Sequence, residues 1–196
     1  MEVTTFYSAK GGAGCTTVAI AYALTREAGE RVLLIDQSPQ GDMDGALGLS
    51  PSVNGERRTV SGDVAMWRST GTDYTAGFDT YGIEGVYDHV VIDCGNHRPD
   101  SAAVRTVLVT RPCYLHLRAA VGGNAPAGIV VVREAGRALG DSDVRYAVGA
   151  PILAIVDIDP AVARAIDAGL LAARLPRSLA TPITAMEVAS VSPSPI

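Results

Sequence analysis

The chain has 196 residues, of which 47% are hydrophobic, a mean hydropathy of +0.21 and a formal net charge of −5. This composition excludes a disordered chain and fits an α/β protein with a substantial core. The apolar runs are too short to span a membrane, and the negative charge argues against nucleic-acid binding by the whole surface, although it allows a local arginine patch. Three cysteines without metal-like spacing, and an N-terminus without a basic leader, predict a cytoplasmic protein.

The N-terminal segment has the layout of a phosphate-binding loop. Residues 3–7 form an apolar strand, a glycine-rich turn follows, and residues 16–28 form a helix that is apolar on most of its circumference. Glycines allow successive backbone N–H groups to turn inward, and the helix N-terminus adds partial positive charge. A hydroxyl directly after such a loop, here Thr16, is suited to hold magnesium. A glycine-rich turn without a ligand is the alternative interpretation.

The turn reads Lys10-Gly11-Gly12-Ala13-Gly14-Cys15-Thr16-Thr17. This string resembles the deviant Walker A loop of the ParA/MinD family of SIMIBI-class partitioning ATPases. The resemblance implies that residues 11–17 bind ATP or ADP, that Thr16 binds magnesium, and that Lys10 is catalytic, reaching across a dimer to the partner's nucleotide. Cys15 departs from the family, because it replaces the lysine that contacts the β- and γ-phosphates. Lys10 is also the only lysine among 16 basic residues, which suggests a site where a guanidinium does not substitute.

The second predicted strand, residues 31–35, leads into Asp36-Gln37-Ser38-Pro39-Gln40-Gly41-Asp42. This segment resembles the Asp-x-Asp-Pro-Gln switch of the family, and Asp36 matches the first, catalytic aspartate. Ser38 stands where the second aspartate orients the attacking water, and a hydroxyl does not supply that negative charge. Hydrolysis is therefore expected to be weak or absent. Asp42 or Asp44 is an alternative source of a carboxylate, and an ordinary turn also fits this composition.

A third strand, residues 89–92, ends at Asp93. The surrounding text resembles the Walker B segment of the family, which implies that Asp93 holds the magnesium shell through water. His89 and His97 are interpreted as surface or strand-end residues, because no third ligand lies near them. Residues 46–85 remain unassigned, apart from a short strand or helical turn at residues 64–67, where Trp67 is expected to pack.

The remaining pattern predicts strands at residues 103–110, 128–132 and 152–156. Helices are predicted from Pro112 to Gly122, over residues 133–139 with closure at Gly140, after Asp141 as N-cap, and from Asp159 to Gly169. Together these elements predict one doubly wound P-loop domain over residues 1–189, with a mostly parallel sheet of about six to seven strands and helices on both faces. Residues 190–196 are predicted to be a disordered tail without a membrane-binding amphipathic helix.

Three functional hypotheses follow from the residues and the resemblance. The first is a ParA-like switch that binds ATP or ADP with magnesium, forms a homodimer and acts in DNA partitioning or cargo positioning with a ParB-like partner. Its DNA contacts are placed at Arg164, Arg174 and Arg177, although a solvated arginine face is the simpler interpretation of these three residues. The second is a nucleotide-free pseudo-ATPase that serves as a scaffold. The third gives Cys15 a lowered pKa at the helix N-terminus and hence a reactive thiolate, whereas a cysteine that packs as a small apolar residue is favoured.

Overall fold

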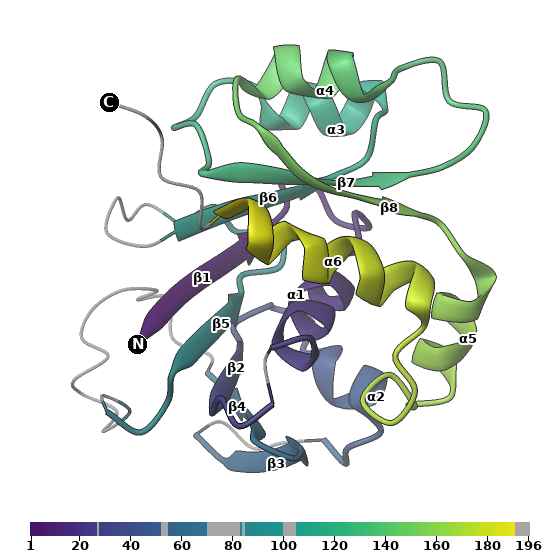
Figure 1. Cartoon of the computed structure of the whole chain (residues 1–196). Coiled ribbons are helices and arrows are strands. Elements are labelled where there is room, and N and C mark those ends of the chain that lie inside the picture. The colour runs from purple at the N-terminus through teal and green to yellow at the C-terminus, as the bar shows by residue number, and fades with distance from the viewer. Residues whose placement is uncertain (27, 52–54, 70–82, 84, 100–104, 191–196) are drawn as a thin grey trace.

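A computed structural model describes residues 1–26, 28–51, 55–69, 83, 85–99 and 105–190 (Figure 1). The strands in these ranges are β1 (Glu2–Tyr7), β2 (Val32–Asp36), β3 (Arg57–Ser61), β4 (Val64–Arg68), β5 (His89–Asp93), β6 (Arg105–Thr110), β7 (Gly128–Arg133) and β8 (Ile152–Asp157). The helices are α1 (Cys15–Leu24), α2 (Met43–Leu47), α3 (Tyr114–Ala120), α4 (Asp141–Val148), α5 (Pro160–Asp167) and α6 (Arg177–Ser190).

Within the described ranges the strands form one eight-stranded sheet in the order β3-β4-β2-β5-β1-β6-β7-β8. Every neighbouring pair is parallel except β3 and β4, which form an antiparallel hairpin at one edge. The predicted doubly wound, mostly parallel α/β fold is therefore confirmed, with one strand more than the expected range.

Both faces of the sheet are buried, which explains the nearly continuous apolar strands. Val32 and Leu34 of β2 pack in a cluster that includes residues of α1, α2, α5 and α6, whereas Leu33 and Ile35 point to the opposite face. Helices α3 and α4 cover that opposite face over β7, where Val144 packs in a cluster with strand residues (Figure 1). Because successive side chains of a strand alternate between faces, only a strand apolar at every position satisfies both layers.

The register of the central strands brings three loops to one edge of the sheet. Asp36 at the end of β2 lies opposite Asp93 at the end of β5, which in turn lies opposite Phe6 near the end of β1. The segments that follow these strands are therefore neighbours. This carboxyl edge is where open α/β sheets place their ligands.

One predicted helix is absent. Residues 134–140 form turns after β7, whereas the sequence predicted a helix over residues 133–139. Gly136 adopts a left-handed φ of 81° in the middle of this stretch, and a helix of only seven residues does not outweigh such an interruption.

Three helix boundaries also differ from the prediction. Helix α1 ends at Leu24, with Thr25 as C-cap, so Gly29 lies in a separate turn instead of closing the helix at residue 28. Helix α3 begins after an extended Cys113, so Pro112 precedes the cap and is not a first-turn residue. Helix α4 is capped by Gly140, not Asp141, because the Asp143 carboxylate accepts a hydrogen bond of 2.8 Å from the Gly140 N–H. Hydrogen bonding, which composition does not record, decides these ends.

The unassigned middle of the chain supplies α2 and the β3–β4 hairpin, so residues 64–67 belong to a strand. Trp67 is buried there, as expected, beneath the Arg57 guanidinium, which lies 5.8 Å from the ring centroid. The sequence did not predict α6, whose residues Leu179, Ile183 and Met186 are fully buried at helical spacing despite Pro182. Of the tail predicted at residues 190–196, Ser190 is instead the last residue of α6, and residues 191–196 lie outside the described residues. Residues 103–104 of the strand predicted at residues 103–110 also lie outside them.

Candidate functional site

The turn between β1 and α1 has the backbone of a cradle. Gly12 and Gly14 have left-handed φ angles of 83° and 92°, a conformation that glycine adopts without steric cost. A Cβ built on Gly11 or Gly12 would meet no atom within 4 Å, so these two glycines border open space. Gly14 is the N-cap of α1, and the first turn of the helix therefore presents its unpaired N–H groups at the loop.

A cavity of about 400 Å³ lies against this loop. Ser8 and the loop residues from Gly11 to Thr17 form one side, and Ser38, Gln40 and Asp42 form another. Asn96 after β5 and Ile166 of α5 also contribute to its lining. Every predicted nucleotide-binding residue therefore borders one cavity, but of the two predicted catalytic residues neither Lys10 nor Asp36 lines it.

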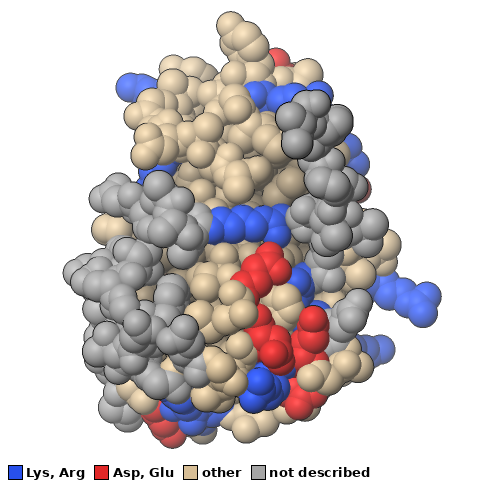
Figure 2. All heavy atoms as spheres, turned by 60° about the vertical axis from the view of Figure 1, so that its left-hand side comes forward, with Lys and Arg blue, Asp and Glu red and all other residues tan. Residues whose placement is uncertain are grey.

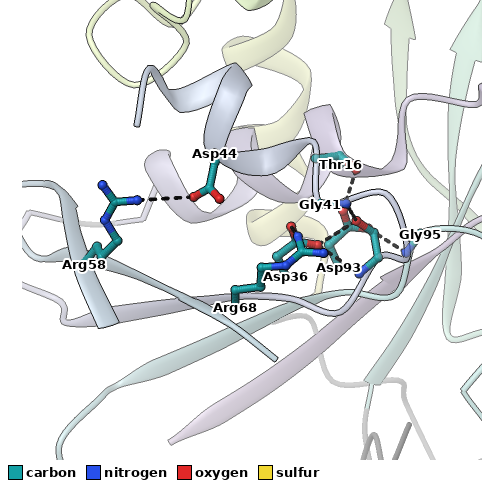
Figure 3. Close-up of polar contacts among 9 residues, drawn as sticks. Thr16, Asp36, Gly41, Asp44, Arg58, Arg68, Asp93 and Gly95 are labelled. Carbon is teal, nitrogen blue, oxygen red and sulfur yellow. Dashed lines mark hydrogen bonds and ion pairs between the residues drawn. The ribbon is translucent and has the colours of Figure 1, made fainter. Parts of the chain in front are cut away.

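The two predicted magnesium residues lie together beside this cavity (Figure 3). The Thr16 hydroxyl donates a hydrogen bond of 2.6 Å to the Asp93 carboxylate, and the Gly95 N–H donates one of 2.9 Å to the other oxygen of that carboxylate. Asp93 is fully buried, and burial raises its pKa. No lysine or arginine of the described residues forms an ion pair with Asp93, so this buried carboxylate lacks a protein counter-ion.

Asp36 is equally buried but has a partner. The Arg68 guanidinium donates a hydrogen bond of 2.9 Å to its carboxylate, and Ser38 donates two more from its N–H and hydroxyl, at 2.9 and 2.7 Å. Burial raises the pKa of Asp36, while these donors oppose the shift. The two carboxylates at neighbouring strand ends thus differ sharply in their surroundings. Arg68 was not predicted as a site residue, because the pairing of β2 with β4 is not encoded in any local pattern of the sequence.

Cys15 behaves as a small packing residue. Its side chain is 6% exposed and belongs to the core cluster beneath α1. Burial, followed by the nearby Asp93 carboxylate, raises the pKa of its thiol well above the ordinary value. The hypothesis of a reactive thiolate with a lowered pKa is therefore wrong, because desolvation outweighs the helix N-terminus.

The remaining candidates lie around the site or away from it. Lys10 is exposed, and its main chain is tied to the Ser8 hydroxyl, which donates a bond of 2.7 Å to the Lys10 carbonyl. Asp44 is buried and forms an ion pair of 3.7 Å with Arg58, so only Asp42 of the two alternative carboxylates faces the cavity.

His89 is the first residue of β5 and lies at the opposite end of the strand from Asp93. Its imidazole lies 3.6 Å from the Glu2 carboxylate and 3.1 Å from the Glu30 carboxylate. His97 is exposed. Among the described residues no group of three or more histidine, cysteine or acidic side chains is arranged to hold a metal. His89 is thus a strand-end residue and His97 a surface residue, as the sequence predicted.

The three arginines singled out near the C-terminus line a second cavity, of about 550 Å³, between α5 and the start of α6. Asp159, the acidic residue in its lining, is already engaged by the Ala161 N–H at 2.7 Å and by the Ser178 hydroxyl at 2.6 Å. In the described part of the chain, no carboxylate lies within 4 Å of Arg164, Arg174 or Arg177.

Several arginines elsewhere on the molecule are paired with carboxylates. Arg31, Arg105 and Arg133 lie 3.5, 3.3 and 2.7 Å from the carboxylates of Asp88, Glu2 and Asp157. On the face shown in Figure 2, basic and acidic side chains likewise lie next to one another. The second cavity is therefore a local concentration of positive charge on an acidic protein.

Comparison with known proteins adds sequence evidence for part of the chain. No model of a known protein family matches the sequence. Over 85 residues the sequence is 36% identical to the chromosome partitioning protein ParA of Caulobacter vibrioides. This match covers 43% of the chain and spans 31% of the length of that relative.

Solved structures match nearly the whole chain. The ParA family ATPase of Chlorobium tepidum superposes with a TM-score of 0.72 at 19% identity, covering 93% of this chain and 96% of its own. MinD of Pyrococcus horikoshii, solved with Mg-ADP, gives 0.73 at 19% identity, with coverages of 97% and 96%. McdA of Cyanothece, solved with ATP, gives 0.68 at 13% identity, with coverages of 100% and 98%. The chain has the ParA/MinD fold. The resemblance predicted from the loop sequence is confirmed.

No described helix of this ParA/MinD-like chain has the length and apolarity needed to cross a bilayer. Cys15 and Ser38, the two positions at which the loop and switch segments depart from the motifs they resemble, both line the loop cavity.

Proposed function

We propose that the protein is a ParA-like nucleotide switch that binds ATP or ADP with magnesium in the cavity beside the phosphate loop. One observation supports this above all. Loop residues with open space over two glycines, the N-terminus of α1, and Thr16, whose hydroxyl lies 2.6 Å from the Asp93 carboxylate, all border one cavity of about 400 Å³. Inward-facing N–H groups at a helix N-terminus are a ready-made site for phosphate. Fold neighbours solved with Mg-ADP and with ATP support the same choice of ligand.

The chemistry of Thr16 and Asp93 fits magnesium. Mg²⁺ prefers oxygen ligands and is usually bound by one or two carboxylates together with water and substrate phosphates. Asp93 provides a buried carboxylate that has no counter-ion among the described residues, and Thr16 provides a hydroxyl beside it. When bound, the ion supplies the positive charge that polarises the phosphates. Thr16 would hold the ion through the hydroxyl oxygen whose proton is now donated to Asp93 at 2.6 Å.

The residues of this chain favour binding over hydrolysis. Phosphoryl transfer depends almost entirely on positioned charge. Cys15 is uncharged and buried, and the Ser38 hydroxyl donates to Asp36 instead of accepting a proton from water. The loop amides still orient a polyphosphate, and the cavity still limits access of water. Hydrolysis is accordingly slow or absent.

Lys10 and the three arginines support the two proposed partners. Lys10 is exposed at the start of the loop and does not line the loop cavity of its own chain. This position suits an ammonium group that reaches a nucleotide bound to a second copy of the chain. Arg164, Arg174 and Arg177 offer three guanidinium groups that have no carboxylate partner in the described part of the chain, which suits non-specific contact with DNA phosphates. A homodimer that moves DNA or another cargo with a ParB-like protein is the corresponding activity.

The test is equilibrium binding of a fluorescent ATP analogue with and without magnesium. We expect binding that magnesium strengthens, and loss of that strengthening in T16V. The matched control is T25V, which changes the same side chain at the other end of α1, where its hydroxyl bonds the Tyr22 carbonyl at 3.2 Å. Sedimentation of the same samples measures whether dimers form with nucleotide and whether K10A removes them.

A pseudo-ATPase scaffold is the second candidate. The burial of Cys15 and the neutralisation of Asp36 by Arg68 favour it, because both remove groups that would respond to nucleotide. Under this alternative the analogue does not bind at millimolar concentration. Binding that saturates below that concentration eliminates the scaffold.

A further inference from the structure

Arg68 connects the edge hairpin to the switch segment, residues 36–42 (Figure 3). It is the last residue of β4, and its guanidinium lies 2.9 Å from Asp36 at the end of the neighbouring β2. The Asp36 side chain is fully buried and the Arg68 side chain is 17% exposed. A charge-assisted bond that is this well shielded from water is stronger than a surface ion pair, and losing one partner leaves an uncompensated buried charge.

Ser38 extends this contact along the segment. Its hydroxyl donates a bond of 2.7 Å to Asp36 and accepts one of 3.2 Å from the Gly41 N–H, while its own N–H donates to the same Asp36 oxygen at 2.9 Å. The guanidinium of Arg68 also covers Gly41, since a Cβ there would lie 1.7 Å from its Nη1. Arg68 thus holds both ends of the loop that forms one side of the cavity.

The same segment packs on the magnesium side of the site. A Cβ added to Gly95 would lie 3.0 Å from that of Ser38, so the two backbones are in close contact. Gly95 donates to Asp93 at 2.9 Å, and its carbonyl accepts from the Ser8 N–H at 2.8 Å. A continuous series of contacts therefore runs from Arg68 through Asp36, Ser38 and Gly95 to Asp93 and the phosphate loop.

We propose that Arg68 is a positioning residue that acts through Asp36 and Ser38 to fix the switch segment against the cavity before any ligand arrives. This proposal rests on the proposed function only where it concerns nucleotide binding; the fixed position of the switch segment does not depend on it. The hydroxyl of Ser38, placed where the family carries a carboxylate, is part of this fixed network. In this protein the side of the cavity opposite the loop is preformed.

A preformed switch segment predicts a specific binding effect. Loop amides of this kind hold the α- and β-phosphates, so the switch segment on the other side of the cavity faces a terminal phosphate. Weakening the network therefore reduces affinity for the triphosphate and leaves the diphosphate unaffected. A general loss of folding would weaken both ligands equally, which makes the ATP-to-ADP affinity ratio the diagnostic quantity.

The first arm uses nucleotide-free protein and measures hydrogen exchange of the Ser38 and Gly41 amides, the two N–H groups that the network holds. We expect protection in the wild type and at least tenfold faster exchange in R68Q. The matched control is R105Q, which removes an ion pair of 3.3 Å with Glu2 at the opposite end of the sheet. Wild-type amides that exchange as fast as those of an unfolded peptide, or R68Q amides that remain protected, overturn the proposal.

The second arm compares the dissociation constants of Mg·ATP and Mg·ADP. We expect the ATP-to-ADP affinity ratio to fall about tenfold in R68Q, as for loss of one hydrogen bond to a charged group, with partial rescue in R68K. In the D36N background the same substitution should have little effect, because its carboxylate target is gone. Equal weakening of both nucleotides, or an undiminished effect in D36N, overturns the proposal.

S38A provides a variant with minimal risk to folding. It removes only the hydroxyl that donates to Asp36 and accepts from the Gly41 N–H, so it should speed exchange of the Gly41 amide. Unchanged Gly41 exchange counts against the network. If no nucleotide binds to the wild type, the proposed function fails while the exchange arm still decides whether Arg68 fixes the segment.

Discussion

The cavity beside the phosphate loop and the cavity between α5 and α6 differ in how each attracts a phosphate. The loop cavity has the backbone shape of a polyphosphate site, but the only charged residue in its described lining is an acid, Asp42. The α5–α6 cavity has Arg164, Arg174 and Arg177 in its lining, without a comparable backbone cradle. Shape and charge, which phosphate sites ordinarily combine, are separated in this molecule.

This separation has different consequences for the two cavities. N–H groups fixed by a loop select the geometry of a ligand but contribute modest affinity without a cation. Guanidinium groups on mobile side chains attract any polyanion, with a strong dependence on salt. We therefore expect specific but weak binding at the loop and salt-sensitive, non-specific binding at the arginines.

Restoring charge to the loop should have the largest effect. In C15K an ammonium replaces the buried thiol at the first position of α1, and its long stem allows the charge to extend into the cavity. One hydrogen bond to a charged phosphate corresponds to roughly a tenfold to hundredfold gain in affinity. Titration of the fluorescent ATP analogue into both proteins measures this gain.

The control for C15K is C15A, which changes packing without adding charge. C15A should bind the analogue like the wild type, since the Cys15 side chain lies in the core. If C15K binds the analogue no more tightly than C15A, an ammonium group at this position adds no affinity. The missing lysine would then not explain weak binding at the loop cavity.

Removing charge from the α5–α6 cavity should have the next largest effect. Three phosphate contacts give a salt slope near −2.7, so affinity for duplex DNA should fall roughly 40-fold between 50 and 200 mM salt in the wild type. Replacing Arg164, Arg174 and Arg177 with glutamine should abolish most of this dependence while leaving nucleotide binding unchanged. Fluorescence anisotropy with a labelled duplex measures both quantities.

A matched triple variant changes arginines that already have partners. Arg31, Arg105 and Arg133 lie within 3.5 Å of carboxylates, so their replacement by glutamine lowers the formal charge by the same amount without touching the cavity. Equal loss of DNA binding in the two triple variants would show that overall charge, not the α5–α6 cavity, attracts DNA.

The sequence predicted the elements that depend on local pattern. Apolar runs ending at Tyr7, Asp36 and Asp93 identified three central strands, because buried parallel strands need no alternation. The glycine loop and the N-cap at Asp159, which accepts from the Ala161 N–H at 2.7 Å, were also readable from residue type and spacing.

What the sequence did not predict depends on contacts between distant segments. Arg68 belongs to the site only because β4 pairs with β2, which places the Arg68 guanidinium beside Asp36. The hypothesis of a lowered pKa for Cys15 considered only the local helix N-terminus and not the surrounding core. The packing role that the sequence favoured for Cys15 agrees with its burial. Helix α6 was missed although its buried positions repeat every three or four residues, because Pro182 interrupts the pattern.

The loop cavity depends on a bound ion for positive charge, and Asp93 is the buried carboxylate proposed to hold that ion. The raised pKa means that the folded protein favours protonated Asp93, so its contribution to stability falls as pH rises from the unfolded value through the folded one. D93N removes this cost. We expect its melting temperature without magnesium to exceed that of the wild type at pH 7 by a few degrees, about 2–4 °C per kcal/mol, and its nucleotide binding to lose magnesium dependence.

The melting comparison has a control of opposite sign. The Arg31 N–H donates a bond of 2.8 Å to Asp88, which lowers the pKa of that exposed carboxyl, so D88N should not stabilise the protein at pH 7. The advantage of D93N should also vanish below the unfolded pKa, where the carboxyl is protonated in both states. If D93N still melts at a higher temperature than the wild type below that pH, the Asp93 side chain destabilises the protein through its packing and not through its charge.

The smallest expected effect tests whether the uncharged residue of the loop is sealed from solvent. Burial raises the pKa values of Cys15 and Cys94, whereas Cys113 is partly exposed with no comparable burial. Alkylation at pH 8 should therefore modify Cys113 first in the native protein and all three thiols after denaturation, as mass spectrometry of the peptides records. Rapid labelling of Cys15 would mean that its thiol opens into the loop cavity. A charge at that position would then need no displacement from the core, and the gain expected for C15K should rise accordingly.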